Sequence, residues 1–145
     1  METRHSIIPA AYLILEKEDN VLLLKRKNTG YEDGNYSLIA GHVEEGETFT
    51  ETMLREVTEE AGVTVKKEDL KPFYIAQRKS TDKSERIDVF FTCSHWEGEI
   101  KNMEPEKCSE LKWFPKHELP NNIIEFIKEV LSTDETQFFG EHNWA

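Results

Sequence analysis

Hydrophobic and polar positions divide the chain into apolar runs separated by polar turns. Residues 6–15 and 21–24 are mostly apolar, and the polar residues 17–20 lie between them. Two apolar runs joined by a short polar turn are typical of a β-hairpin. We therefore expect the fold to begin with two antiparallel strands.

Four later runs have the composition of strands. Residues 70–78 and 86–96 flank a polar turn, so they predict a second hairpin. The other two runs, residues 36–40 and 109–114, are shorter. The chain therefore offers enough strands for one sheet.

A helical period replaces the strand pattern after residue 48. Thr48 is a good N-cap, Glu51 completes a capping box with it, and Gly62 is suited to end the helix in a left-handed conformation. At 100° per residue one stripe of this helix is apolar and predicts its buried face. The stripe consists of Phe49, Met53, Leu54, Val57 and Ala61.

A second helix is expected over residues 122–131, with Asn121 as its cap. Its apolar residues fall on one face, which is typical of a helix that only packs on the sheet. The members of this face are Ile123, Ile124, Ile127, Val130 and Leu131.

The first helix also carries a cluster of carboxylates. Helical spacing places Glu56, Glu59 and Glu60 along one edge of the apolar stripe, and Glu60 falls inside it. A solvated acidic face is the ordinary interpretation of such a helix. In this helix the glutamates repel one another beside the core, which indicates a compensating cation. Their hard oxygen atoms suit Mg²⁺ or Mn²⁺.

Length, charge and cysteine usage narrow the class of protein. The 145 residues suit one domain over 1–132, followed by a tail, 133–145, that either docks or is disordered. The net charge of −11 opposes binding to nucleic acid or anionic membranes. The longest apolar run, residues 7–15, is too short to span a bilayer. Cys93 and Cys108 are expected to be reduced thiols of a cytoplasmic protein.

Residues 41–63 resemble the signature of the Nudix hydrolase family. That signature has a glycine, five residues, a glutamate, seven residues, Arg-Glu, an aliphatic residue, any residue, Glu-Glu, any residue, a glycine and an aliphatic residue. Every specified position is matched in this chain. The matching residues are Gly41, Glu47, Arg55, Glu56, Val57, Glu59, Glu60, Gly62 and Val63.

The resemblance implies an α/β/α sandwich with a mixed β-sheet, and a Mg²⁺-dependent hydrolase in which Mn²⁺ can substitute. It implies that Glu56, Glu59 and Glu60 ligate the metal together with the carbonyl of Gly41. It also implies that Arg55 orients Glu47 and its loop. Glu56 is the expected base, with Glu59 as a further catalytic carboxylate.

Outside the signature, similarity to MutT-type members implies three further site residues. Glu106 is expected to add a carboxylate to the metal site, although a solvated loop acid is an equal alternative. Arg26 aligns with a basic substrate-binding position, or is simply an exposed strand end. Ser37 lies where such enzymes often read the base. Residues 38–41 read Leu-Ile-Ala-Gly instead of the common Leu-Pro-Gly-Gly, which bears on the shape of the pocket.

Three functions follow from the resemblance. The first is hydrolysis of a nucleoside triphosphate, oxidised or non-standard ones included, to the monophosphate and pyrophosphate. It is favoured because residues 78–80 lack the Pro or Tyr marker of ADP-ribose and dinucleoside-polyphosphate members. The second is a pyrophosphatase acting on ADP-ribose or another nucleoside diphosphate derivative. The third is a non-catalytic nucleotide sensor. In each of the three, the partner is a small nucleotide. The protein itself is expected to be a monomer or a homodimer.

Overall fold

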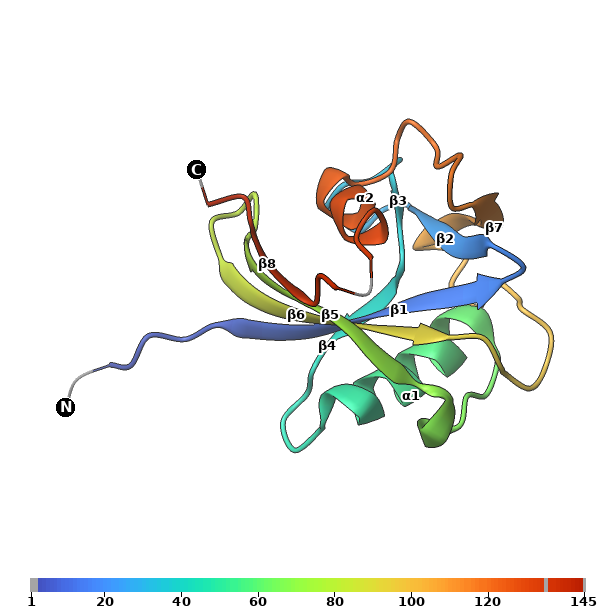
Figure 1. The fold of residues 1–145 in the computed structure, drawn as a ribbon, viewed down its shortest axis with the longest axis horizontal. Coiled ribbons are helices and arrows are strands. Elements are labelled where there is room, and N and C mark those ends of the chain that lie inside the picture. Colours follow the sequence, from blue (N-terminus) through green and yellow to red (C-terminus); the bar gives the residue numbers. More distant parts are fainter. Residues whose placement is uncertain (1–2, 135, 145) are drawn as a thin grey trace.

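The computed structural model describes residues 3–134 and 136–144, whose strands join into one mixed eight-stranded sheet with a helix on each side (Figure 1). The expected α/β/α sandwich is therefore confirmed. The elements are β1 (Ile8–Lys17), β2 (Asn20–Arg26), β3 (Tyr36–Ser37), β4 (Ile39–His42), α1 (Phe49–Ala61), a 3₁₀ turn (Lys67–Asp69), β5 (Lys71–Lys79), β6 (Glu85–Cys93), β7 (Cys108–Pro115), α2 (Glu125–Leu131) and β8 (Phe139–His142).

Strand β1 is the centre of the sheet. It pairs antiparallel with β4 on one side and parallel with β6 on the other. The expected first hairpin exists only at its turn, where Glu16 pairs with Val21 and Lys17 with Asn20. Beyond that turn β2 leaves β1 and pairs with β3 and β7 instead. The second expected hairpin, β5 with β6, is present along its length.

The two faces of β1 contribute to two separate cores. One core lies under α2 and the other under α1. Because both faces of β1 are buried, its sequence is almost continuously apolar and does not alternate. Ala10, Tyr12 and Ile14 belong to the first core, and Ala11, Leu13 and Leu15 to the second.

The ends of α1 follow the sequence rules closely. The hydroxyl of Thr48 accepts from the backbone N–H of Glu51 at 3.1 Å, and Glu51 Oε1 accepts from the N–H of Thr48 at 2.9 Å. Gly62 ends the helix with φ of 71°. Met53, Val57 and Ala61 are fully buried against β1 and β4. The predicted capping box and C-cap are confirmed.

Helix α2 begins later than the sequence predicts. Its N-cap is Ile124 and no side chain caps it, so the prediction of Asn121 as cap was wrong. The residues before it are extended because they pair with β3. Tyr36 forms a bridge with Ile123, and the carbonyl of Tyr36 accepts from the N–H of Ile124 at 3.0 Å.

The predicted strand at residues 36–40 is divided. Tyr36 and Ser37 pair with β2 as β3, whereas Ile39 begins β4, which pairs with β1. The chain thus crosses from one part of the sheet to the other at Leu38, which is itself buried. This crossing places β4 directly before the acidic segment that leads to α1.

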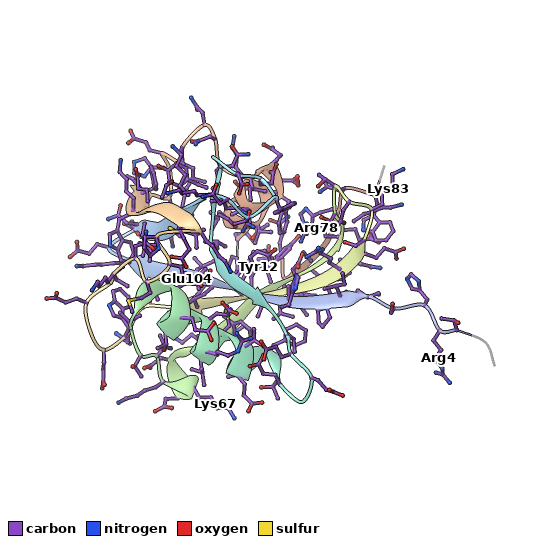
Figure 2. All side chains as sticks on the ribbon, turned by 180° about the vertical axis from the view of Figure 1, so that it is seen from behind. Arg4, Tyr12, Lys67, Arg78, Lys83 and Glu104 are labelled. Atoms are coloured by element: carbon purple, nitrogen blue, oxygen red, sulfur yellow. The ribbon has the colours of Figure 1, made fainter. Side chains whose placement is uncertain are left out.

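The described part of the tail docks on the sheet. Strand β8 pairs in parallel with β5 at the edge (Figure 1). At the other end of the chain, Arg4 lies on an arm that projects beyond the fold (Figure 2). Cys93 and Cys108 are buried free thiols. No helix within residues 3–134 and 136–144 has the length and apolar character needed to cross a membrane.

Candidate functional site

Arg55 connects the acidic groups of α1 with those of the loop before it. Its Nε donates to Glu47 Oε2 at 2.8 Å and its Nη2 to Glu47 Oε1 at 3.0 Å. Its Nη1 donates to Glu56 Oε1 at 2.6 Å and to Glu59 Oε2 at 3.4 Å. The guanidinium therefore holds the loop before α1 and the carboxylates of α1 in one network.

Glu47 anchors the loop end of this network. Besides Arg55, its Oε1 accepts from the hydroxyl of Thr52 at 2.7 Å and from the N–H of Glu44 at 3.1 Å. Arg55, then Thr52, lower the pKa of Glu47 to about 2. Glu47 is thus held as an anion in a fixed orientation, the arrangement expected of a residue that positions Arg55.

Glu56 and Glu60 form the buried part of the carboxylate cluster. Burial raises the pKa of Glu56, against the opposing effect of Arg55. Burial, and then the neighbouring Glu56, raise the pKa of Glu60 well above its usual range. Glu60 Oε2 accepts from the N–H of Ala40 at 3.1 Å, so β4 fixes its position. Glu59 is more exposed, with 52% of its side chain accessible.

Gly41 approaches α1 so closely that it has no room for a side chain. A Cβ atom there would overlap the carboxyl group of Glu56. Gly41 pairs with Ala11 in the sheet, so its backbone cannot easily retreat. A side chain at position 41 would therefore displace the Glu56 carboxyl group, so glycine permits this contact.

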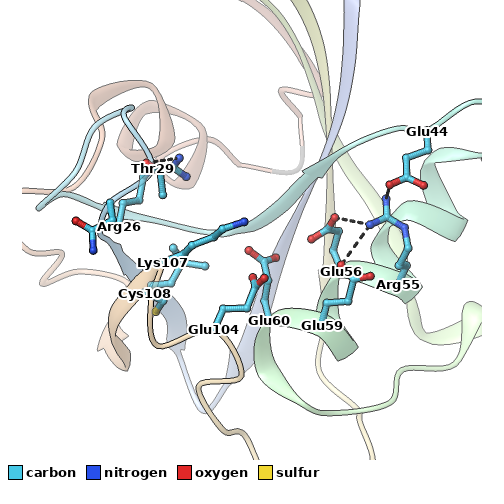
Figure 3. A pocket seen from close by; sticks show the side chains of 12 residues that line it. Arg26, Thr29, Glu44, Arg55, Glu56, Glu59, Glu60, Glu104, Lys107 and Cys108 are labelled. Atoms are coloured by element: carbon cyan, nitrogen blue, oxygen red, sulfur yellow. Dashed lines mark hydrogen bonds and ion pairs between the residues drawn. The ribbon is translucent and has the colours of Figure 1, made fainter.

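The carboxylates form one wall of a cavity of about 520 Å³ (Figure 3). In Figure 3, Arg26 and Lys107 lie opposite Glu56, with Glu60 and Glu104 between them. A cavity with acids on one wall and cations on the other suits an oligophosphate held through metal ions. Its lining residues are Leu24, Arg26, Asn28, Thr29, Glu44, Arg55, Glu56, Glu59, Glu60, Glu104, Lys107 and Cys108.

The structure brings Glu104, and not Glu106, to this cluster. Glu104 lines the cavity beside Glu60, whereas Glu106 is exposed and does not line it (Figure 3). The reason is a turn after Glu104, whose carbonyl accepts from the N–H groups of Lys107 and Cys108. Glu106 lies at the outside of that turn, so Glu104 is the carboxylate of this loop that lines the cavity.

The donor chemistry of the cluster fits a hard divalent cation. Glu56, Glu60 and Glu104 offer oxygen atoms, the hard ligands that such a cation prefers. Burial is the main cause of the raised pKa values of Glu56 and Glu60, and the nearby carboxylates add to it. In their present rotamers, however, Glu56 and Glu59 are directed to Arg55. Accordingly, no group of three His, Cys, Asp or Glu side chains within the described residues has the arrangement of a formed metal site.

The two predicted substrate-binding residues lie in different surroundings. Arg26 lines the cavity and donates from Nε to the backbone carbonyl of Tyr31 at 2.6 Å. Its guanidinium carbon lies 5.1 Å from the centre of the Tyr31 ring. Ser37 is buried in β3 opposite Leu24 and does not line the cavity. Of the two, the fold brings only Arg26 to the carboxylates.

A second cavity of about 290 Å³ adjoins the first at Arg26. It lies on the face of β1 that carries Tyr12, and it is unexpectedly basic for a chain of this charge. Arg86 donates from Nη1 toward His42 Nε2 at 3.0 Å, and burial followed by Arg86 lowers the pKa of His42. The lining residues are Ala10, Tyr12, Arg26, Tyr31, Ala40, Gly41, His42, Arg78 and Arg86.

Arg78 was not singled out by the sequence. Its Nε donates to Asp88 Oδ2 at 2.7 Å, and both side chains are almost fully buried. The Oδ1 atom of Asp88 has no hydrogen-bond partner among the described residues. A signal was present, because Asp88 has the same parity in β6 as the buried Phe90 and therefore faces the core.

Comparison with known proteins identifies the fold and its relatives. The family model described as NUDIX domain matches residues 7–133. An ADP-ribose pyrophosphatase of Methanocaldococcus jannaschii is 36% identical over 120 residues, which are 81% of this chain and 67% of that protein. The NAD-capped RNA hydrolase NudC of Photobacterium profundum is 33% identical over 79% of this chain, but the match spans only 40% of NudC.

Solved structures with the same fold include MutT and NUDIX proteins. The MutT protein of Bacillus halodurans is 28% identical, with a TM-score of 0.71 over 94% of this chain and 90% of that chain. A MutT NUDIX hydrolase of Burkholderia pseudomallei superposes with a TM-score of 0.80 over 88% of this chain and 97% of that chain. At 20% identity, the second likeness supports the fold alone.

Proposed function

The chain belongs to the NUDIX domain family, as a pyrophosphohydrolase of that family, and from this we propose that it cleaves the pyrophosphate linkage of a nucleoside triphosphate. The products are the nucleoside monophosphate and pyrophosphate. One observation carries the proposal. The partly buried carboxylates of Glu56 and Glu60 face Arg26 and Lys107 across a single cavity, so an oligophosphate fits between them.

Each residue of the cavity has a role in this reaction. Glu56, Glu59, Glu60 and Glu104 would hold the divalent metal, together with the Gly41 carbonyl. When bound, Mg²⁺ or Mn²⁺ neutralises phosphate charge and lowers the pKa of a coordinated water. Glu56 accepts the proton of the attacking water.

The remaining groups bind and orient. Arg26 and Lys107 bind phosphate oxygens from the opposite wall, where neither forms a close ion pair with an acidic side chain among the described residues. Arg55 keeps Glu47 and Glu56 in place through direct hydrogen bonds. The water oxygen forms a bond to phosphorus, and the anhydride oxygen leaves with the pyrophosphate.

A nucleoside diphosphate derivative is the second candidate substrate. It is favoured by the relative named ADP-ribose pyrophosphatase, whose match covers most of both chains. The nucleoside triphosphate is placed first because residues 78–80 lack the Pro or Tyr marker of ADP-ribose and dinucleoside-polyphosphate members. A nucleotide sensor without catalysis is disfavoured because all the carboxylates of the signature are present.

The test is a turnover screen with product analysis. Purified protein with Mg²⁺ is incubated with canonical and oxidised nucleoside triphosphates, with ADP-ribose and with dinucleoside polyphosphates. Monophosphate and pyrophosphate in equal amounts support the first proposal, whereas AMP and ribose 5-phosphate support the second. Binding without turnover of any compound supports the sensor.

Two variants assign the activity to this cavity. Glu56→Gln removes a charge from the proposed metal site, and Glu45→Gln removes one from an exposed glutamate of the same segment that lines neither cavity. We expect Glu56→Gln to abolish turnover and Glu45→Gln to retain it. Equal activity in both variants would show that the chemistry takes place elsewhere.

The organisation around this activity is also part of the proposal. We take residues 1–132 as the catalytic domain and 133–145 as a tail, in a cytoplasmic protein that is a monomer or a homodimer. Sedimentation of the purified protein distinguishes the two assemblies.

A further inference from the structure

The C-terminal segment contributes to a third cavity, although it lies beyond residue 133, where the family match ends. This cavity of about 450 Å³ lies between the loop that carries Tyr31, the turn after β5 and the start of α2. Asn143 from the end of the tail lines it. The tail is therefore part of a cavity wall as well as an edge strand.

The three cavities are connected by shared residues. Arg26 lines the first and the second, and Tyr31 and Arg78 line the second and the third. In the view of Figure 2, Tyr12 of the second cavity lies between Glu104 of the first and Arg78 of the third. The cavities therefore follow one another from the carboxylates of the first to Asn143 of the third.

Side-chain contacts hold the tail against the sheet and α2. His142 is buried, and its Nε2 lies 2.8 Å from the hydroxyl of Tyr74 while its Nδ1 lies 3.0 Å from Glu129 Oε2 on α2. Gly140 packs directly on the Tyr74 hydroxyl, and a Cβ atom there would overlap it. Trp144 Nε1 donates to the carbonyl of Gln77 at 2.9 Å. Contacts on both sides of Asn143 thus fix its position.

The lining of the third cavity suits the nucleoside end of a nucleotide. Tyr31 and Phe126 supply aromatic surface, and the buried guanidinium of Arg78 lies 4.2 Å from the centre of the Phe126 ring. Ser80 and Thr81 add hydroxyl groups. The other lining residues are the aliphatic Ile124 and the charged Glu32, Lys79, Lys83 and Glu125. An aromatic face with hydrogen-bonding groups beside it suits a bound heterocycle. The carboxylates that would hold the metal are absent from this lining, so the phosphates belong at the other end.

We propose that the third cavity holds the nucleoside of the substrate and that Asn143 is a specificity-determining residue that hydrogen-bonds to its base. An asparagine side chain offers both a donor and an acceptor, so it can distinguish bases by their hydrogen-bonding edges. This inference rests on the proposed function, because it assumes that the phosphates lie at the carboxylates of the first cavity.

The variant that tests this is Asn143→Gly. Asn143 has a φ of 64°, a left-handed conformation that glycine adopts without strain, so the substitution removes the side chain and keeps the backbone. The control is Phe138→Ala in the same tail, because Phe138 is 70% exposed and lines none of the three cavities. Each protein is assayed for kcat and KM with ATP, GTP, CTP and UTP.

We expect Asn143→Gly to raise KM for the preferred base by about two- to tenfold, the effect of one hydrogen bond, with kcat retained. The ranking of the four nucleotides by kcat/KM should flatten, and Phe138→Ala should keep the wild-type ranking. A merely structural role for Asn143 would change all four nucleotides equally. An equal change, or no change, therefore overturns the proposal.

Dissociation constants for the same four nucleotides, measured by calorimetry without divalent metal, separate this inference from the proposed function. If the wild-type protein hydrolyses no nucleoside triphosphate, canonical or oxidised, the proposed function fails. The inference on Asn143 is then decided by binding alone. It holds if Asn143→Gly flattens the binding preference, and it fails if the preference is unchanged.

Discussion

Gly41 and Glu56 are in such close contact that a methyl group on Gly41 would overlap the Glu56 carboxyl group. The contact joins the sheet to the helix, since Gly41 pairs with Ala11 of the central strand and Glu56 belongs to α1. The backbone of β4 therefore determines where the Glu56 carboxylate lies.

Gly41→Ala is predicted to remove activity and to preserve the fold. The added methyl group displaces the Glu56 carboxylate, and a displacement of about 1 Å at a reacting group can cost about 10²-fold in rate. Steady-state kinetics measure the loss, and circular dichroism checks the fold. Near-wild-type turnover in a folded variant would contradict the assigned role of Glu56.

Arg55→Lys is predicted to lower kcat by about ten- to a hundredfold, the range seen when groups that orient metal ligands are changed. Lysine keeps the positive charge but cannot donate to Glu47 from two nitrogens while contacting Glu56. Lys101→Arg, at an exposed site outside the cavities, is the control for a Lys/Arg exchange. If Arg55→Lys is as active as the control, charge alone is sufficient at this position.

Glu104 and Glu106 form a matched pair for testing the metal site. Glu104→Gln removes a carboxylate from the cavity. It is therefore predicted to raise the Mg²⁺ concentration needed for half-maximal activity by about tenfold or more, as for other changes around metal ligands. Glu106→Gln is predicted to leave this Mg²⁺ concentration unchanged, because Glu106 is exposed and lies outside the cavity. Activity titrated against Mg²⁺ concentration measures both. The opposite order would restore Glu106 as the ligand.

The Arg78–Asp88 pair is predicted to give stability a distinctive dependence on pH. Burial raises the pKa of Asp88, although Arg78 opposes the rise. A raised pKa means that the folded state binds the proton more tightly than the unfolded chain. The contribution of Asp88 to stability is therefore complete below its ordinary pKa and is lost as pH rises through the raised value.

The measurement is urea unfolding of the wild type and of Asp88→Asn, from a pH below 3.8, the ordinary pKa of an aspartate, upward through the raised pKa of Asp88. The free energy of unfolding of the wild type should fall relative to that of the variant as the pH rises, and the difference should then level off. A difference that grows with rising pH would show that Arg78 dominates and lowers the pKa of Asp88 instead.

The features that sequence predicted well depend on local chemistry. The capping box at Thr48, the left-handed Gly62 and the edge formed by Glu56, Glu59 and Glu60 follow from residues within one or two helical turns of each other. The family signature lies within the same segment. Short-range rules were therefore sufficient for α1 and its carboxylates.

The features that sequence did not predict depend on distant partners. Glu104, and not Glu106, lines the first cavity because of one turn of the backbone. Helix α2 starts late because Tyr36 pairs with Ile123 and Ile124. Neither contact leaves a local pattern. The role of Tyr31 and Asn143 in the third cavity likewise arises only when the loop and the tail meet.

The parallel pairing of β1 with β6 also has a consequence for biosynthesis. Ile8 pairs with Arg86, so the central strand acquires this neighbour only after more than half of the chain has been synthesised. Until then one hydrogen-bonding edge of an apolar strand stays open, and such edges promote association between nascent chains. Release of the chain before β6 is complete would therefore leave a fragment with this edge exposed and prone to association.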